Sequence, residues 1–299
     1  MQRQLPFWRS MMYVPGNVER FIEKAHTRGA DALIIDLEDS VLPADKPATR
    51  AAVQQVAERI GRTGLDIAVR INRPWRLAVP DLEAVISPRI RALALPKVAD
   101  ASHVRAIAEI CDELEAERGM VNGHTVFVAM VETADAFFEL REIAKASRRV
   151  VGLTLGSEDF ALSLGMLAEP EGLHTFTLPT VAAARAAGIL PMGFVGSIAQ
   201  FGDREAFRGM IRQARRLGFE GAMCIHPDQV AILNQEFAPS EAEVRHAEKV
   251  IVADREARAQ GRGSFTVDGK MGDIPIVVRA EQTLAKRDRI AKLQAKAGG

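Results

Sequence analysis

Residues 126–159, VFVAMVETADAFFELREIAKASRRVVGLTLGSED, indicate the fold most clearly because they contain one arrangement twice. In each half a short apolar run is followed by acidic residues: Glu132 comes directly after the run at 126–131, and Glu158 and Asp159 follow the run at 150–155 after two intervening residues. The runs do not alternate with polar residues, which is typical of parallel strands buried on both faces. An amphipathic stretch at 134–146 separates them, so this segment predicts two parallel strands joined by a helix.

The same alternation of strand and helix continues on both sides of this stretch. There is no sequence-level repeat, but eight β-rich runs can be recognised, at 10–14, 32–37, 66–71, 92–95, 126–131, 150–155, 190–195 and 221–225. The amphipathic segments between them include 48–60, 102–118, 134–146, 180–187 and 203–217. Eight strands alternating with helices predict a TIM (β/α)8 barrel, a fold that typically needs about 250 residues.

The pattern changes after the eighth run. A long charged helix is expected at 240–260, beginning with the Ser-x-x-Glu sequence from Ser240 to Glu243 that is typical of a capping box. An extended piece at 264–272 and a final helix at 275–296 follow. A minimal barrel needs none of these elements. We therefore expect a barrel over 1–235 and a C-terminal helical lid or arm over 236–299.

Composition excludes several classes of protein. Lys+Arg and Asp+Glu are each 39, so the net charge is zero and no basic surplus indicates nucleic acid or anionic lipid as a partner. No apolar run is long enough to span a membrane, and the first residues lack the apolar core of a signal peptide. Cys111 and Cys224 have no zinc-type spacing. These features predict a cytoplasmic protein that acts on a small molecule.

Acidic residues collect after the predicted strands, where the active site of a TIM barrel lies. Six of them follow the second, fifth and sixth runs: Asp36, Glu38, Asp39, Glu132, Glu158 and Asp159. Such carboxylates would repel one another without a cation. Oxygen ligands without cysteine or clustered histidine favour magnesium, which usually takes one or two carboxylates. Glu132 and Asp159 are the expected Mg²⁺ ligands, and Asp36, Glu38 and Asp39 are expected to orient metal-bound water.

Four further strand-end residues are candidates. Arg70 could bind an anionic oxygen bidentately or pair with a barrel carboxylate. Asn72 follows it in the same loop. Lys97 could neutralise neighbouring carboxylates or form a Schiff base with an oxo acid. His226 could be a general base or hold the eighth loop through a His-Pro turn.

Ten short motifs, in family order and covering most of the chain, resemble citrate lyase β-subunit-like proteins of the HpcH/HpaI aldolase superfamily. They are RSMMYVPG at 9–16, DLEDSV at 36–41, RIN at 70–72, LPK at 95–97, VET at 131–133, LGSEDF at 155–160, AARAAG at 183–188, LGFEG at 217–221, IHP at 225–227 and VDGKMGD at 267–273.

The resemblance implies a carbon–carbon lyase that acts on citryl-, malyl- or citramalyl-like thioesters of coenzyme A. It implies that Glu132 and Asp159 bind Mg²⁺ and that Arg70 contacts the oxo acid. It further implies that Asp273, on the lid, acts as acid or base in the site of a neighbouring subunit of a homotrimer or homohexamer. The lid motif favours a CoA thioester, because CoA-free aldolases of the superfamily generally lack it.

Two segments depart from the family pattern. Many relatives have an aspartate soon after the AARAAG motif, where this chain has ILPMGF at 189–194. Relatives often have a small residue after the Glu-Thr pair, where this chain has DAFF at 135–138. Both departures bear on acyl specificity. The competing functions are a CoA-independent aldolase using pyruvate, a Schiff-base aldolase at Lys97, and a catalytically silent paralogue.

Overall fold

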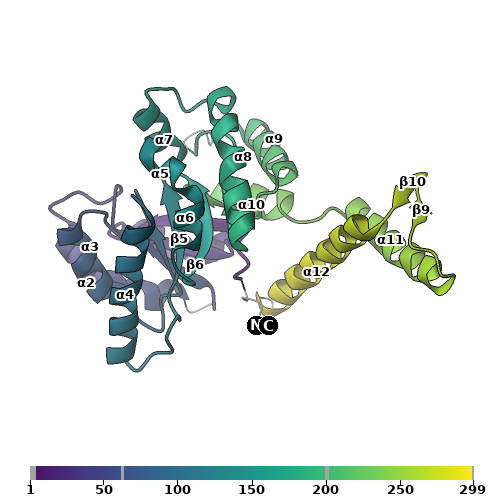
Figure 1. Ribbon diagram of the computed structural model, residues 1–299. Helices are drawn as coiled ribbons and strands as arrows, with labels where there is room; N and C mark the ends of the chain where they lie inside the picture. Colours follow the sequence, from purple (N-terminus) through teal and green to yellow (C-terminus); the bar gives the residue numbers. More distant parts are fainter. Residues whose placement is uncertain (1–4, 62–63, 199–201, 298–299) are drawn as a thin grey trace. The chain divides into compact units, whose positions relative to one another are not determined.

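The computed structural model describes residues 5–61, 64–198 and 202–297 of the chain, and Figure 1 shows it as a ribbon. The chain divides into two compact units, Met1–Phe237 and Ala238–Gly299, named below the barrel unit and the C-terminal unit. None of the helices described combines the length and the apolar character needed to cross a lipid bilayer.

The barrel unit confirms the predicted TIM barrel. Its strands form one eight-stranded sheet in the order β7-β6-β5-β4-β3-β2-β1-β8, and each neighbouring pair in this order runs parallel. The strands are β1 Ser10–Pro15, β2 Ala32–Asp36, β3 Asp66–Arg70, β4 Ala92–Leu95, β5 Val126–Val131, β6 Val150–Leu155, β7 Leu190–Met192 and β8 Ala222–Cys224. A parallel bridge between Met192 and Gly221 closes the sheet between β7 and β8.

Helices follow the strands and surround them, as the teal and green helices in Figure 1 show. They are α1 Glu19–Ala25, η1 His26–Arg28, α2 Lys46–Ile60, α3 Trp75–Val85, α4 Ala101–Glu117, α5 Ala134–Phe138, α6 Leu140–Lys145, α7 Ser157–Leu164, α8 Pro170–Ala187, α9 Arg204–Leu217 and α10 Pro227–Glu236. The helix expected at 134–146 is split in two at Glu139. The helix expected at 180–187 begins earlier, because Pro170 fits the first turn, where its missing N–H costs nothing.

Two apolar layers show which side chains point into the barrel. The outward-facing side chains of the strands pack with the helices in the larger layer, which contains Leu33, Ile35 and Val69. The inward-facing ones form a smaller layer, which includes Met11, Ile34, Ala68 and Met130. Side chains two residues apart on a strand point the same way.

This alternation directs four residues into the mouth of the barrel, each two positions after an inward-facing apolar residue: Tyr13 after Met11, Asp36 after Ile34, Arg70 after Ala68 and Glu132 after Met130. The hydrophobic core therefore determines the position of the polar site. A one-residue slip in register would turn all four side chains towards the helices.

The C-terminal unit has a small core of its own. It consists of α11 Glu241–Ala259, the antiparallel pair β9 Phe265–Val267 and β10 Lys270–Gly272, and α12 Ile274–Ala297. Phe265 of the hairpin packs with Val250 and Val277 of the two helices. The predicted capping box is confirmed, since Ser240 accepts from the Glu243 N–H while the Glu243 carboxylate accepts from Ser240.

Candidate active site

A cavity of about 510 Å³ opens at the C-terminal ends of the barrel strands. Its lining residues are of two chemical kinds that lie next to one another, and we name the two groups by their chemistry the acidic wall and the apolar wall. The acidic wall carries Asp36, Asp39, Arg70, Glu132, Glu158 and Asp159. The apolar wall carries Tyr13, Met130, Phe194, Ile198, Met223 and Ile225. The structure thus brings strand-end residues from distant parts of the sequence into one enclosure.

Arg70 is held by the carboxylates that follow β2. Its Nε and one terminal nitrogen donate to the two oxygens of Asp36, at 2.7 and 2.8 Å. Its other terminal nitrogen lies 2.9 Å from Glu38 Oε2. Burial alone would raise the pKa of Asp36, but the hydrogen bonds and charge of Arg70 outweigh it and lower that pKa. Arg70 is therefore a fixed cation, as a residue that must position an anion requires.

Tyr13 lies beneath this guanidinium, whose carbon is 4.8 Å from the centre of the phenol ring. The Tyr13 hydroxyl contacts the sulfur atoms of Met223 and Met130, at 3.0 and 3.8 Å. Burial raises the pKa of Tyr13, so the hydroxyl stays protonated. Thioether sulfur is a weak acceptor, so the floor of the cavity has little polar character.

Lys97 links the carboxylates of the acidic wall. Its backbone is in the left-handed region, with a φ of 46°, which is unusual for a side chain of this kind. Its backbone N–H donates to Glu132 Oε2 at 2.5 Å, and its Nζ lies 2.8 Å from Glu38 Oε1 and 3.9 Å from Asp159 Oδ1. Desolvation lowers the pKa of Lys97, but Glu38, Asp39 and Asp159 raise it by more. The ammonium is thus stabilised in its charged form.

Glu132 is the most deeply buried carboxylate after Asp36 in this lining, with only 3 % of its surface exposed. Burial, together with the charges of Glu38 and Asp159, raises its pKa to about 7, although the Lys97 N–H acts in the opposite direction. Asp159 lies in the first turn of α7 and is more exposed. Glu132 therefore lacks a full countercharge among the described residues around it.

Gly156 keeps the space that Glu132 occupies. A Cβ at this position would lie 2.5 Å from the Glu132 carboxylate, far inside van der Waals contact. The Gly156 N–H also donates to the Val131 carbonyl at 2.9 Å, so the end of β6 lies directly against the end of β5. The glycine in the LGSEDF segment is thus needed for close approach rather than for an unusual backbone angle.

The acidic wall fits a hard divalent cation. Among the described lining residues, five carboxylates face one arginine, and the donor atoms are oxygens, which magnesium prefers. In the part of the chain that the structure describes, no three His, Cys, Asp or Glu side chains already surround one metal position. A cation held by Glu132 and Asp159 would therefore complete its coordination with water and substrate oxygens, as magnesium commonly does.

Three other candidates lie elsewhere. Asn72 is buried away from the cavity lining, where its side-chain amide donates to the Leu37 carbonyl and to Asp81. His226 is the N-cap of α10 and accepts a hydrogen bond from the Asp228 N–H. This favours a role in holding the eighth loop over a role as general base. Asp273 is exposed in the C-terminal unit, between β10 and α12.

Two lining residues, Glu158 and Tyr13, have no role predicted from the sequence. Glu158 lines the cavity and accepts a hydrogen bond from the buried Ser197 hydroxyl, which comes from the loop after β7. It follows the same strand as Asp159, so strand-end position alone selects both without distinguishing them. Tyr13 could have been found by counting two residues from Met11 along the first strand.

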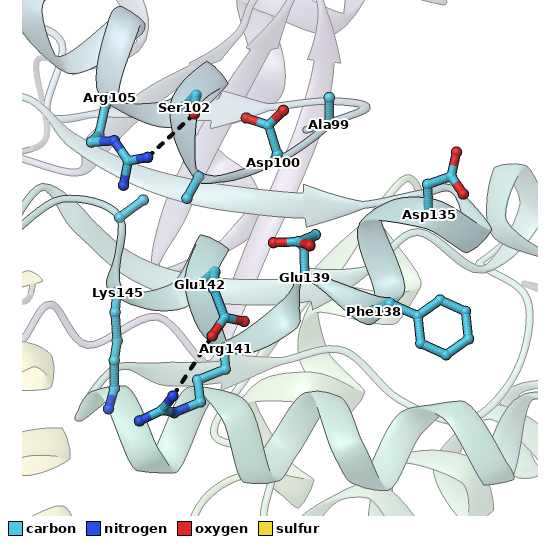
Figure 2. A pocket seen from close by; sticks show the side chains of 12 residues that line it. Ala99, Asp100, Ser102, Arg105, Asp135, Phe138, Glu139, Arg141, Glu142 and Lys145 are labelled. Carbon is cyan, nitrogen blue, oxygen red and sulfur yellow. Dashed lines mark hydrogen bonds and ion pairs between the residues drawn. The ribbon is translucent and has the colours of Figure 1, made fainter.

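A second hollow, of about 860 Å³, lies outside the barrel between the start of α4 and helices α5 and α6. Figure 2 shows its lining, in which Arg105 bonds to Ser102 and Arg141 pairs with Glu142. The ring of Phe138, 83 % exposed, lies at one end of this groove. Its acidic and basic side chains are mixed and its walls are open, so we assign the site to the smaller cavity in the barrel mouth.

The fold and the cavity define a TIM-barrel protein whose catalytic end presents carboxylate oxygens and one fixed arginine. The chain belongs to the HpcH/HpaI aldolase/citrate lyase family, whose model matches residues 9–227. This confirms the resemblance drawn from the short motifs.

Three similar proteins extend over almost the whole chain. The (3S)-malyl-CoA thioesterase of Cereibacter sphaeroides is 36 % identical, over 99 % of this chain and 100 % of its own length. Citrate lyase subunit beta of Leuconostoc mesenteroides subsp. cremoris is 33 % identical, over 92 % of each chain. The structure of CitE from Mycobacterium tuberculosis with magnesium, acetoacetate and coenzyme A is 27 % identical, with a TM-score of 0.75 over 96 % of this chain and 99 % of that one.

Proposed function

We propose that this chain is a magnesium-dependent carbon–carbon lyase that cleaves or forms a 3-hydroxyacyl-CoA thioester, giving acetyl-CoA and a 2-oxo acid. The observation that carries the proposal is the placing of Glu132, Asp159 and Arg70 on one cavity at the C-terminal end of the barrel. Support also comes from the CitE structure from Mycobacterium tuberculosis, which holds magnesium, acetoacetate and coenzyme A.

The reaction breaks the bond between the carbinol carbon and the methylene carbon next to the thioester. The hydroxyl loses its proton and becomes the carbonyl of the 2-oxo acid, while the electron pair of the broken bond passes to the thioester as an enolate. The methylene carbon then takes up one proton and becomes the methyl group of acetyl-CoA. The step needs no oxidant, and in the condensation direction the same transfers run in reverse.

Magnesium bound by Glu132 and Asp159 would supply Lewis-acid chemistry at the oxygens of the oxo-acid fragment. Arg70 is positioned by Asp36 and Glu38 before substrate arrives, so it stabilises negative charge on the carbinol oxygen without reorganisation. Asp36, Glu38 and Asp39 fix two cations: Arg70, which lines the cavity, and Lys97, which lies next to the lining.

Asp273 is the proposed acid or base at the methylene carbon, acting in the site of a neighbouring subunit of a trimer or hexamer. It lies between a hairpin and a long helix in a unit with its own core, so it can be carried as one body with that unit. Its test is hydrogen exchange: Asp273→Asn should block exchange of the acetyl-CoA methyl hydrogens with solvent, followed by NMR in deuterated water, and should leave Mg²⁺ affinity unchanged. Exchange at the normal rate would remove Asp273 from this role.

Hydrolysis of the same thioester is the second candidate, favoured by the 36 % identity to a malyl-CoA thioesterase. The two reactions share a substrate class but differ in products. A lyase releases acetyl-CoA and a 2-oxo acid, whereas a thioesterase releases free CoA and a hydroxy acid. A thiol reagent together with a 2-oxo acid assay distinguishes them in one reaction mixture.

A Schiff-base aldolase, a CoA-independent aldolase and a silent paralogue have less support. A Schiff base at Lys97 needs a neutral amine, whereas Glu38 and its neighbours raise the pKa of Lys97. Failure of borohydride to trap pyruvate on Lys97 is the expected result. A CoA-independent aldolase would use pyruvate with an aldehyde, and a silent paralogue would turn over no substrate. A panel of malyl-, citramalyl- and citryl-CoA with magnesium or with EDTA tests all three, and no turnover of any thioester would refute the proposed lyase.

A further inference from the structure

The two walls of the cavity differ in a way that bears on the substrate. The acidic wall holds every charged side chain that the structure places in the lining. The apolar wall is built from β1, β5, β8 and the loop after β7, and presents two thioethers, a phenol and branched or aromatic side chains. A substrate that fills the cavity must therefore place part of itself against apolar atoms.

Positive charge is scarce in this enclosure. Arg70 is the single basic residue among the described lining residues, and three of its five N–H groups already face Asp36 and Glu38. Lys97 is not among the lining residues, and its ammonium is shared by three carboxylates, 2.8 Å from Glu38, 3.7 Å from Asp39 and 3.9 Å from Asp159. The two remaining N–H groups of Arg70, one of them on the nitrogen that also lies 3.6 Å from Asp39, suffice for one oxo-acid group next to the proposed cation. A second carboxylate in the cavity would meet other carboxylates or the apolar wall.

We infer that the chain selects thioesters whose oxo-acid fragment carries one carboxylate and a small alkyl substituent. In the general substrate CoA-S-CO-CH2-C(OH)(R)-COO⁻, R is then methyl, and the oxo acid released is pyruvate. A carboxymethyl group at R, which would release oxaloacetate, is rejected. This inference rests on the proposed lyase function and specifies the substrate class of the same site.

The expected preferences follow from transfer free energies. A methyl group against the apolar wall gains about 0.8 kcal/mol over hydrogen, which corresponds to roughly a fourfold higher kcat/KM. An unpaired carboxylate in an enclosed site costs much more, and we expect roughly a hundredfold lower kcat/KM for carboxymethyl than for methyl. Repulsion by Glu132 and Asp159 acts in the same direction unless the cation binds the added carboxylate.

The test compares three CoA thioesters that differ only at R: hydrogen, methyl and carboxymethyl. Initial rates with magnesium should rank methyl above hydrogen and hydrogen well above carboxymethyl. A carboxymethyl substrate within tenfold of the methyl substrate, or hydrogen above methyl, would overturn the inference.

A binding measurement separates this inference from the proposed function. In thermal-shift titrations with Mg²⁺, pyruvate should stabilise the protein at lower concentrations than oxaloacetate does, whether or not any thioester is cleaved. If no thioester is turned over while this order of binding holds, the lyase proposal fails and the selectivity of the cavity stands. If thioesters are cleaved and oxaloacetate binds more tightly, the selectivity fails and the lyase stands.

Adding a positive charge to the apolar wall by substitution provides a further test. Ile225 lines the cavity but is 43 % exposed, so Ile225→Lys places an ammonium there without burying it in the core. We expect it to raise the ratio of carboxymethyl to methyl kcat/KM at least tenfold. Val121→Lys, at an 80 % exposed position outside the lining, adds the same charge and should leave the ratio unchanged. An unchanged ratio in Ile225→Lys would count against an apolar wall that excludes the second carboxylate.

Discussion

The two ends of the barrel differ in how their charged side chains are paired. At the N-terminal ends of the strands, buried charges have close partners of opposite sign. Arg149, immediately before β6, donates to both carboxylate oxygens of Glu115, at 2.9 and 2.6 Å, to Asp112 and to the Thr125 carbonyl. Arg9, before β1, forms a bidentate pair with Asp31, before β2, at 2.8 and 2.7 Å.

At the C-terminal ends of the strands, the described carboxylates outnumber the basic side chains. In the described part of the chain, five carboxylates and one arginine line the cavity, and burial raises the pKa of Glu132 to about 7. In TIM barrels the C-terminal end carries the activity and the N-terminal end the stability. Charges are thus matched at the end where they stabilise the barrel, and they are unmatched at the end where we propose that a cation and a substrate bind.

Among substitutions that test this difference between the two ends, we expect the largest effect at Glu132. Glu132→Gln should lower kcat/KM roughly a thousandfold or more, because a ligand of the proposed cation is lost. The same change should not lower the free energy of unfolding without metal, because it removes a buried charge that lacks a full partner. Activity assays, calorimetric Mg²⁺ titration and urea unfolding measure the three quantities.

A conservative control is available in the outer groove, where the exposed Glu139 lines a hollow of mixed charge. Glu139→Gln should change neither activity nor Mg²⁺ affinity. Unaltered Mg²⁺ affinity in Glu132→Gln would contradict the assignment of Glu132 as a ligand.

The opposite outcome is expected at the N-terminal end. Arg149→Met should lower the free energy of unfolding by about 3–5 kcal/mol, because it leaves Glu115 buried without its cation. Activity per folded molecule should stay near that of the unchanged protein, since Arg149 lies at the other end of the strands. Denaturant unfolding and active-site titration check the two statements.

Arg148→Met is the matched control, because the neighbouring side chain is less buried and bonds to Asn122. Its cost should stay within about 0.5 kcal/mol. A similar loss of stability in both variants would show that the buried network is not what stabilises this end.

The contrast should also appear in the pH dependence of stability. Burial raises the pKa of Glu115, but hydrogen bonds from Arg149 and from the N–H groups of Thr125 and Gly123 lower it to about 2. Because the folded pKa is below the ordinary value of 4.5, the stabilisation is present above pH 4.5 and is lost as the pH falls towards 2. It amounts to roughly 3 kcal/mol.

Urea unfolding at pH 6, 4 and 3 measures this loss, with Glu115→Gln as the comparison. The variant should be less stable at pH 6, and its stability should fall less steeply below pH 4.5. Parallel pH profiles for the two proteins would refute the role given to Glu115.

Much of the fold and part of the site could be predicted from the sequence because parallel buried strands leave a strong local signal. The runs at 126–131 and 150–155 match β5 and β6, and the acidic residues after them line the cavity. The run at 190–195 contains Pro191 and Gly193, and β7 ends at Met192 because Gly193 adopts a positive φ of 126° there.

What the sequence could not show is how side chains share partners across the barrel. Nothing local indicates that Lys97 donates its backbone N–H to Glu132 and its ammonium to Glu38, since both contacts depend on strand order and on a left-handed backbone. Nor could the pattern distinguish Asn72, which is bound to Asp81 behind the site, from residues that face the cavity. Strand-end position selects candidates, and the direction of the side chain decides among them.

The smallest effect follows from the glycine that lies where the barrel wall meets the acidic wall. Gly156 is part of the barrel wall, yet the atom it lacks would collide with the Glu132 carboxylate at 2.5 Å. Gly156→Ala should therefore displace the Glu132 carboxylate by about 1 Å, and we expect kcat/KM to fall roughly a hundredfold, since a misplacement of that size can have that effect. Gly172→Ala is the matched control, because its added Cβ would meet only the flexible Met166 side chain, at 3.1 Å. Both variants should keep the melting temperature within a few degrees. A hundredfold loss of kcat/KM in Gly156→Ala alone, without unfolding, would locate the effect at the Glu132 carboxylate. Equal activities of the two variants would show that Glu132 tolerates the shift.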